Sequence, residues 1–300
     1  MNFLRQLGLG FRNYGKAIGY IRTHKLYWYF PIPALLMLVI YFIGSEVSHW
    51  QASWDTQKGC LECVTMNDTI WFLIKLLVSI FLGLTLMKFS KYIVVILLSP
   101  LFSILSEKVE KDLTGNKYPF SLRQTIHDVK RGVRIALRNI IWTYVFISII
   151  LLVTFFGWEN PRASPFFYLS YFIVFFYYGF SFIDYINERR RLDIVQSIHF
   201  MRNHRGLAIA IGSVYSLLIL VPVDIGVMLD YSNFLEAPFE TLGASLSQVL
   251  LWFLASVSPI LAIVAATLSM HELVDLSSNK WSQKARENED IVSYRYRDDE

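Results

Sequence analysis

The sequence predicts an all-α integral membrane protein that crosses the bilayer several times. Hydrophobic residues make up 54% of the chain and charged residues only 17%, against about 25% charged residues in a typical soluble domain. The apolar residues are gathered in long runs that nearly exclude charge, as the hydrocarbon core of a bilayer requires. Lys and Arg are frequent in alternate connections between these runs, which is the pattern that orients membrane proteins.

The first 25 residues predict an amphipathic helix that lies in the lipid headgroup layer. Apolar and basic residues alternate there at helical spacing. The apolar positions are Phe3, Leu4, Leu7, Phe11, Tyr14, Ile18 and Ile21, and the basic ones are Arg5, Arg12, Lys16 and Arg22. Since this stretch has neither an uninterrupted apolar core nor a small-residue cleavage site, we do not expect a cleaved signal peptide.

Six apolar segments follow, and each can form a helix that satisfies its own backbone hydrogen bonds in lipid. They cover Leu26–Gly44, Thr69–Leu105, Asn139–Trp158, Pro165–Asp184, Leu207–Val223 and Val249–Met270. The second is longer than one crossing requires and carries Lys88 and Lys91 near its middle, where we expect both side chains to extend to the headgroups. We expect this segment to leave the bilayer there and to continue as an amphipathic stretch towards Gly115.

The basic residues predict that both termini and the longer polar connections lie on one side of the membrane, the cytoplasmic side. Lys and Arg number 5 before the first segment, 8 in Ser106–Arg138, 5 in Tyr185–Gly206 and 5 after His271. The other connections hold 1, 1 and 0, in Ser45–Asp68, Glu159–Ser164 and Asp230–Gln248. These counts leave open whether the pairs 139–184 and 207–270 cross fully or enter and return from one side.

The connections add a second amphipathic helix and a polar tail. The helix begins after Pro119, with Ser121 and Gln124 at capping-box spacing, and its basic residues Arg131, Arg134 and Arg138 share one side. We interpret 1–273 as a single helical membrane domain. Residues 274–300 mix charges of both signs with few apolar residues, so we predict a mobile cytoplasmic tail.

The sequence has no pattern typical of an enzyme, a cofactor or a metal site. It lacks a nucleophile elbow, a Walker loop, a His-Glu-x-x-His motif and a dinucleotide-binding glycine pattern. Cys60 and Cys63 have no second pair that would complete a zinc site, so they form a small loop disulfide or remain two thiols. Most basic residues lie beside apolar runs, so membrane topology explains the net charge of +4 and we expect no nucleic-acid binding.

Ionisable residues at membrane depth are candidates for function, because each costs several kcal/mol there unless it is paired or hydrated. The candidates are Lys75, Lys88, Lys91, Glu107, Glu110, Arg131, Arg134, Asp184, Arg202 and Asp224. For Glu107, Glu110 and Arg131, amphipathicity alone allows internal pairing and solvent exposure equally. The segment Pro165–Tyr185 holds 12 Phe or Tyr residues, for which we expect packing and lipid contact.

The stretch Ser99–Gly115 reads Ser-Pro-Leu-Phe-Ser-Ile-Leu-Ser-Glu-Lys-Val-Glu-Lys-Asp-Leu-Thr-Gly. It resembles the Pro-x-x-x-x-Leu-x-Glu-x-x-Glu-x-x-Leu-x-Gly pattern of the CysZ-type sulfate permease family of bacterial inner membranes, whose domain is shared with the etoposide-induced transmembrane proteins. Further matches follow in order and with similar gaps: Asp128, Arg131, Asp184-Tyr185, Arg202, Gly212 and Ala265-Ala266-Thr267.

The resemblance implies two long transmembrane helices plus two helical hairpins that only partly penetrate the bilayer. It also implies homo-oligomers, a bacterial inner-membrane location and sulfate uptake. Glu107, Glu110 and Arg131 match charged positions of the family, which implies a network of carboxylates and guanidinium groups that lines a pore.

The sequence departs from the family at three places. Lys25-Leu26-Tyr27-Trp28 stands where the family has Gly, an aliphatic residue and two arginines at a sulfate-binding turn, so an anion site there would rest on Lys25, His24 and backbone amides. Asp184-Tyr185-Ile186 replaces Asp-Tyr-Pro, and an insertion of about 25 residues covers roughly 229–251.

Our leading hypothesis is a transporter or channel for a small oxyanion such as sulfate. Arg131, Arg134 and Lys25 would attract the anion while Glu107 and Glu110 hold the arginines, and His24, Asp184 and Arg202 complete the candidate set. The expected partners are the lipid bilayer, the anion and further copies of the chain, with no cofactor. The competing hypothesis is a membrane scaffold or assembly factor of the same fold that transports nothing.

Overall fold

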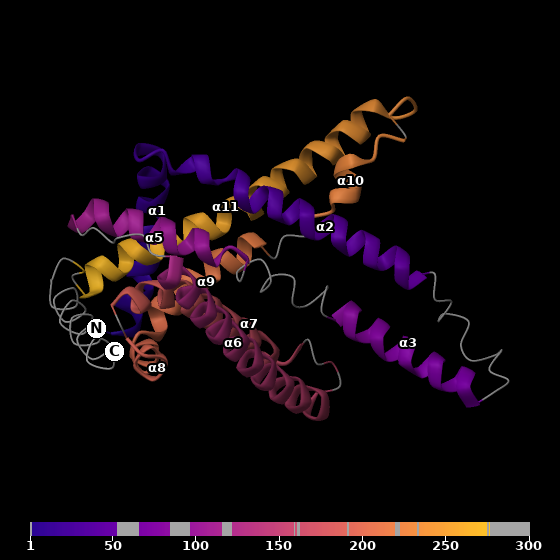
Figure 1. The fold of residues 1–300 in the computed structure, drawn as a ribbon, viewed down its shortest axis with the longest axis horizontal. Coiled ribbons are helices and arrows are strands. Elements are labelled where there is room, and N and C mark those ends of the chain that lie inside the picture. Colours follow the sequence, from indigo (N-terminus) through magenta and orange to yellow (C-terminus); the bar gives the residue numbers. More distant parts are fainter. Residues whose placement is uncertain are drawn as a thin grey trace, which may run out of the picture.

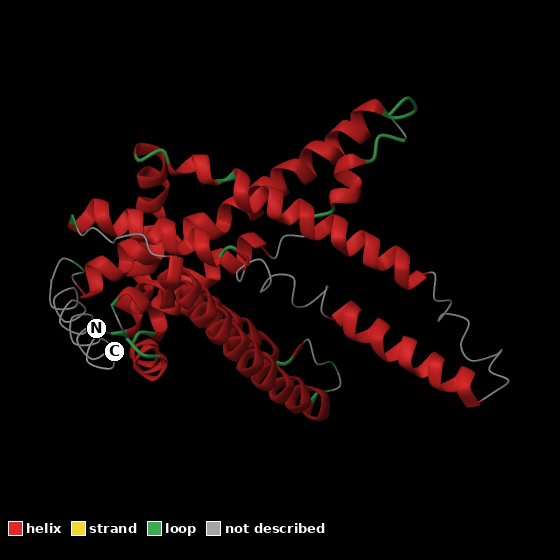
Figure 2. Cartoon of the chain, in the orientation of Figure 1, coloured by secondary structure: helices red, strands yellow, loops and turns green. Residues whose placement is uncertain are grey.

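The computed structural model is predominantly helical in the residues it describes. These are 2–52, 66–84, 97–115, 122–158, 160, 163–190, 192–219, 223–232, 234–274 and 276, and no strand occurs among them (Figure 2). The predicted all-α class is therefore confirmed. Cys60, Cys63, Lys88, Lys91 and nearly all of the predicted tail lie outside the described residues.

Ten α-helices and one 3₁₀-helix are described. They are α1 Phe3–Thr23, η1 Leu26–Tyr29, α2 Pro31–Ala52, α3 Met66–Leu84, α5 Ser99–Thr114, α6 Leu122–Gly157, α7 Pro165–Arg189, α8 Ile194–Asn203, α9 Arg205–Ile219, α10 Ile225–Leu229 and α11 Pro238–Val274. Figure 1 shows α1, α5, α8, α9 and the end of α11 gathered at one end of the molecule. Helices α2, α6, α7 and the first half of α11 extend away from this end as long arms.

Four described helical stretches are long and apolar enough to cross a membrane. They are Leu26–Val47, Lys130–Gly157, Pro165–Arg189 and Pro238–Val274. Since a helix rises 1.5 Å per residue, the roughly 30 Å hydrocarbon core requires about 20 residues. Helix α9 has 15 residues and spans only about 22 Å, which is too short. The chain is thus a multi-pass membrane protein with one buried apolar helix that does not reach across.

Local sequence signals explain where several elements begin and end. Helix α7 begins at Pro165, which has no N–H to satisfy, and the backbone amide of the next residue, Phe166, donates to the Ser164 hydroxyl at 3.2 Å. Helix α8 begins with a capping box formed by Asp193 and Gln196. Helix α5 ends at Gly115, whose φ of +74° is a left-handed conformation that glycine adopts without strain.

The predicted boundaries change most in the long helices. The amphipathic stretch expected after Pro119 and the apolar segment from Asn139 form one continuous helix, α6, of 36 residues. The last predicted segment begins eleven residues earlier than expected, because the inserted residues 238–248 are also helical. Helix α11 therefore has 37 residues, with Pro259 buried inside it.

Helix α9 is the centre of the core because small residues allow its neighbours to approach closely. It packs against α1, α7 and α11. A Cβ atom at Gly212 would lie 1.7 Å from the carbonyl oxygen of Phe175, and one at Gly179 would lie 1.8 Å from that of Ala208. Inside a bilayer the hydrophobic effect does not drive helices together, so close backbone packing of this kind holds them.

Helix α1 has one face that packs against other helices and one exposed apolar face. The predicted helix is present, but the face that packs on α9 and α11 is made largely of small and polar residues: Gln6, Leu9, Gly10, Asn13, Tyr14, Ala17 and Ile21. Most of the predicted apolar stripe, including Leu4, Phe11 and Ile18, is exposed. This exposed stripe remains available for the headgroup layer, where we predicted the helix to lie.

Candidate functional site

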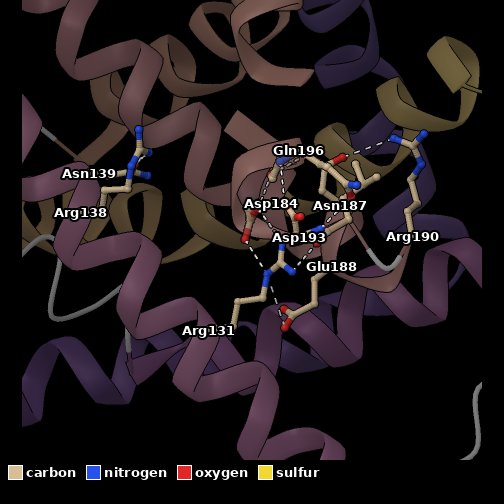
Figure 3. A network of polar contacts seen from close by, with 11 residues as sticks. Arg131, Arg138, Asn139, Asp184, Asn187, Glu188, Arg190, Asp193 and Gln196 are labelled. Carbon is tan, nitrogen blue, oxygen red and sulfur yellow. Dashed lines mark hydrogen bonds and ion pairs between the residues drawn. The ribbon is translucent and has the colours of Figure 1, made fainter. Parts of the chain in front are cut away.

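Charged side chains from α5, α6 and α7 meet at the end of α7 and form a buried polar network. Helix α7 packs against both α5 and α6, so the charges on its last two turns are buried between them. The network consists of two ion-paired groups, one around Arg131 and one around Arg189 (Figure 3 shows the first).

Arg131 of α6 is held by two carboxylates on one face of α7. Its Nη2 lies 3.3 Å from Asp184 Oδ1, and its Nε lies 3.7 Å from Glu188 Oε1. Asp184 and Glu188 are four residues apart, so they face the same way on a helix. The Nη1 atom donates to the carbonyl oxygen of Leu192 at 2.5 Å. With only 11% of its side chain exposed, Arg131 is occupied by these partners.

The same aspartate also positions the beginning of α8. Ser197 donates its hydroxyl to Asp184 Oδ1 at 2.5 Å, and Asn187 donates to the Ser197 hydroxyl oxygen at 3.0 Å. All three side chains are buried. Arg131, through Asp184, therefore joins α6 to both α7 and α8.

The second group pairs Glu110 of α5 with Arg189 of α7. The Nε atom of Arg189 lies 2.8 Å from Glu110 Oε2, and its Nη1 donates to the Ser106 hydroxyl at 2.6 Å. The two charged side chains are 10% and 4% exposed. The remaining nitrogen, Nη2, is buried and has no hydrogen-bond partner among the described residues.

Arg190 extends the network towards α8. Its guanidinium lies 5.2 Å from the centre of the Phe200 ring and donates to Asn187 Oδ1 at 3.4 Å. Burial lowers the pKa of Arg190, and the nearby negative charge of Glu110 opposes that effect. With Arg190 included, three arginines face three carboxylates, Glu110, Asp184 and Glu188. The network is therefore close to neutral, which reduces the free-energy cost of burying it.

The structure places the predicted site residues in three different environments. Glu110, Arg131 and Asp184 belong to the network, and Glu107 is half-buried about one turn before Glu110. Arg134 and Arg202 are exposed. His24 and Lys25 lie in the turn after α1, away from any described ion pair.

The pairing differs from the prediction, which joined Glu107 and Glu110 to Arg131 and Arg134. The described ion pairs instead join Arg131 to Asp184 and Glu188, and Glu110 to Arg189. The physical reason is that α7 lies against both α5 and α6 and supplies a partner to each.

Glu188 and Arg189 are not among the site residues that we predicted from the sequence. Both fall in the run Glu188-Arg189-Arg190-Arg191, which we interpreted only as a topology signal. The available signal was the spacing of Asp184 and Glu188, because two carboxylates four residues apart at the end of an apolar helix predict a buried basic partner.

The turn after α1, where we predicted an anion site, places His24 and Lys25 in different surroundings. The His24 ring stacks on Tyr20 at 3.9 Å, and its Nδ1 lies 3.1 Å from the Tyr20 carbonyl oxygen. Lys25 is exposed with a φ of +55°. The helix that follows, η1, has only four residues, so few backbone amides converge there.

Contacts with α5 hold this turn in place. The Tyr20 hydroxyl donates to Asp112 Oδ2 at 3.0 Å, and the Lys108 Nζ lies 5.7 Å from the centre of the Tyr29 ring. Burial and the Asp112 carboxylate raise the pKa of Tyr20, so its hydroxyl remains a donor. These contacts indicate that the turn joins α1 to α5.

Comparison with known proteins gives one match that covers most of this architecture. A family model described as sulfate transporter CysZ/etoposide-induced protein 2.4 matches residues 13–229. This range runs from α1 to the end of α10 and includes every residue of the network. No curated protein matches the chain.

Proposed function

Since the chain belongs to the sulfate transporter CysZ/etoposide-induced protein 2.4 family, we propose that it passes a small oxyanion, sulfate foremost, across a bacterial inner membrane. We propose further that it does so as a homo-oligomer, with both termini in the cytoplasm. It is a carrier or pore in this proposal and catalyses no covalent chemistry.

The observation that carries the proposal is the buried Nη2 donor of Arg189, which has no hydrogen-bond partner among the described residues. A buried guanidinium nitrogen without a partner loses the free energy of a charge-assisted hydrogen bond. A tetrahedral oxyanion is a suitable acceptor for Nη2, because its negatively charged oxygens accept charge-assisted hydrogen bonds. Glu110 and Ser106 hold the other two nitrogens of Arg189, so Nη2 is fixed in direction.

The rest of the network has a supporting role in this proposal. Arg131 already uses its donors on Asp184, Glu188 and Leu192, so it positions α6 against α7 and α8. Arg190 adds positive charge beside Arg189. This division replaces the earlier expectation that Arg131, Arg134 and Lys25 attract the anion.

Uptake of labelled sulfate into proteoliposomes made from the pure protein tests the proposal. The informative variant is Glu110→Gln with Arg189→Gln, which removes the donor while keeping the charge balance. The matched control is Arg12→Gln with Glu272→Gln, which removes an exposed ion pair between α1 and α11. We expect uptake by the wild type and the control, and uptake at least about tenfold lower for the network variant, since one charge-assisted contact is worth about 1.5–3 kcal/mol.

Two results would count against this proposal. Uptake by the wild type no faster than leakage into empty liposomes would exclude sulfate transport and favour the scaffold hypothesis. Equal uptake by the wild type and the network variant, with both eluting as folded protein, would show that Arg189 does not contact the anion.

A further inference from the structure

A groove with a basic end and an aromatic wall runs between α6, α7 and the α8–α9 corner. Its volume is about 570 Å³. The basic residues that line it are Arg138, Arg202 and Arg205, and the other lining residues are Trp142, Phe146, Phe172, Ile173, Phe176, Tyr177, Phe180, Ile198 and Ile209. No carboxylate lines it among the described residues.

Two side-chain ladders form the long walls of this groove. On α6 the ladder is Arg138, Trp142 and Phe146, and on α7 it is Phe180, Phe176 and Phe172. Each ladder has a spacing of four residues, so its members share one helix face. The Arg138 guanidinium lies 5.8 Å from the centre of the Phe180 ring, which fixes the register of the two antiparallel helices. The groove is therefore basic at one end and apolar over about 12 Å beyond it.

The three arginines have unused donors. In the described part of the chain, none of them forms an ion pair. Among the described residues, Arg138 donates to Asn139 Oδ1 at 3.4 Å and Arg205 donates to the carbonyl oxygen of Arg202 at 2.9 Å. Figure 3 shows Arg138 on α6, apart from the cluster of Arg131 and Asp184. Three like charges that line one groove repel each other unless an anion lies between them.

The direction of the groove matches that of a lipid in a leaflet. Its basic end lies where α8 meets α9, in the connection whose basic residues predict the cytoplasmic face. Its aromatic end follows α6 and α7 into the stretches long enough to span the membrane. A leaflet provides about 15 Å of hydrocarbon, close to the length of the ladder. A free inorganic anion would use the arginines but not the aromatic wall.

We propose that this groove binds an anionic phospholipid, with the phosphate on Arg138, Arg202 and Arg205 and an acyl chain between the ladders of α6 and α7. The bound lipid joins the α6–α7 pair to the α8–α9 corner. Nothing in this proposal requires that the protein transport sulfate, so the two proposals can fail separately.

The test is lipid retention measured by native mass spectrometry. The full-length protein is reconstituted with equal amounts of phosphatidylglycerol and phosphatidylcholine of matched chains and extracted in mild detergent. We expect the wild type to retain phosphatidylglycerol. Arg138→Gln with Arg202→Gln and Arg205→Gln should weaken retention roughly a hundredfold, at about fivefold for each arginine. A control with the same charge change at exposed positions outside α1 and the groove, Lys75→Gln with Lys111→Gln and Lys130→Gln, should stay within about threefold of the wild type.

A second variant tests the acyl-chain half of the groove and leaves all three arginines intact. Phe146 and Phe172 are both substantially exposed, so Phe146→Ala with Phe172→Ala should fold. We expect it to bind long-chain phosphatidylglycerol about tenfold more weakly, with little change for a short-chain analogue. If the arginine variant does not fold, the binding of long-chain phosphatidylglycerol by this aromatic variant tests the proposal.

Three outcomes would overturn the proposal. One is equal retention of the anionic and the zwitterionic lipid by the wild type. Another is unchanged retention of phosphatidylglycerol in the arginine variant. The third is displacement of the lipid by millimolar inorganic sulfate together with no effect of the aromatic variant, which would identify the basic end as a site for a free anion.

Discussion

At the scale of single residues, four arginines on or beside α6 and α7 differ in what surrounds them. Arg131 and Arg189 are buried and paired with carboxylates, whereas Arg134 is exposed and Arg138 faces a groove that no described carboxylate lines. A buried pair contributes little net stability when it forms, but removing one partner leaves an uncompensated charge. We therefore expect replacement of Arg131 to change the stability of the protein far more than replacement of Arg134, three residues further along α6.

Replacing Arg131 with alanine should destabilise the protein strongly. It leaves Asp184 and Glu188 buried without their partner, which costs about 3–5 kcal/mol. Arg134→Ala, on the same helix but exposed, should change stability by no more than about 0.5 kcal/mol. Thermal unfolding in detergent measures both variants. Equal melting temperatures would show that Arg131 is solvated.

The partners of Arg131 can be identified by rescue. Adding Asp184→Asn and Glu188→Gln to Arg131→Ala removes the stranded carboxylates, so part of the lost stability should return. Adding Glu110→Gln to Arg131→Ala should give no rescue, because the described partner of Glu110 is Arg189. Rescue by Glu110→Gln alone would favour the pairing predicted from the sequence. The readout is the same melting temperature.

At the scale of elements, glycines set the distances between helices. Gly179 and Gly212 allow the backbones of α7 and α9 to touch. Gly10 does the same for α1 and α9, because a Cβ atom added at Gly10 would lie 2.5 Å from the Cβ atom of Ala210. Helix α9 is shorter than the bilayer is thick and is held from several sides. Its position therefore depends on close packing more than on its own apolarity.

Adding one methyl group at Gly212 should separate α7 from α9. The new Cβ of Gly212→Ala would lie 1.7 Å from the Phe175 carbonyl oxygen, and overpacking of this kind typically costs about 1–3 kcal/mol or more. Gly15→Ala on α1 is the control, since no atom lies within 4 Å of its added Cβ, and it should be neutral or up to about 1 kcal/mol stabilising. Similar melting temperatures for the two variants would contradict the close approach.

At the scale of the whole molecule, the arrangement of the helices agrees with the alternation of basic residues. Figure 1 shows α1, α8 and the end of α11 at one end, and the turn between α10 and α11 at the other. The connection that holds α8 carries 5 Lys and Arg residues, whereas Asp230–Gln248 carries none. The two ends of the fold thus differ in basic residues, and the cytoplasmic placement of the basic end is a prediction from the positive-inside pattern.

Cysteine labelling should reveal the orientation of these two ends. In a background with Cys60→Ser and Cys63→Ser, Leu235→Cys should react with an impermeant thiol reagent added outside the cell. Val195→Cys should react only after the membrane is opened. Both positions are well exposed, so accessibility within the protein does not limit labelling. Reaction at Val195 alone in intact cells would reverse the orientation.

The sequence by itself determined the helical class, the multi-pass membrane character and the family resemblance, because hydropathy and helical periodicity act over neighbouring residues. It also named Glu110, Arg131 and Asp184 as candidates, but left open whether Glu110 and Arg131 are buried or exposed. Only the tertiary structure decided the partners, because Arg189 and Glu110 are separated by 79 residues and Arg131 and Asp184 by 53. A helical repeat gives the face on which a charge lies but not the helix that covers it. Here that choice follows from the close packing of α7 and α9 at Gly179 and Gly212 and from the position of α7 against both α5 and α6.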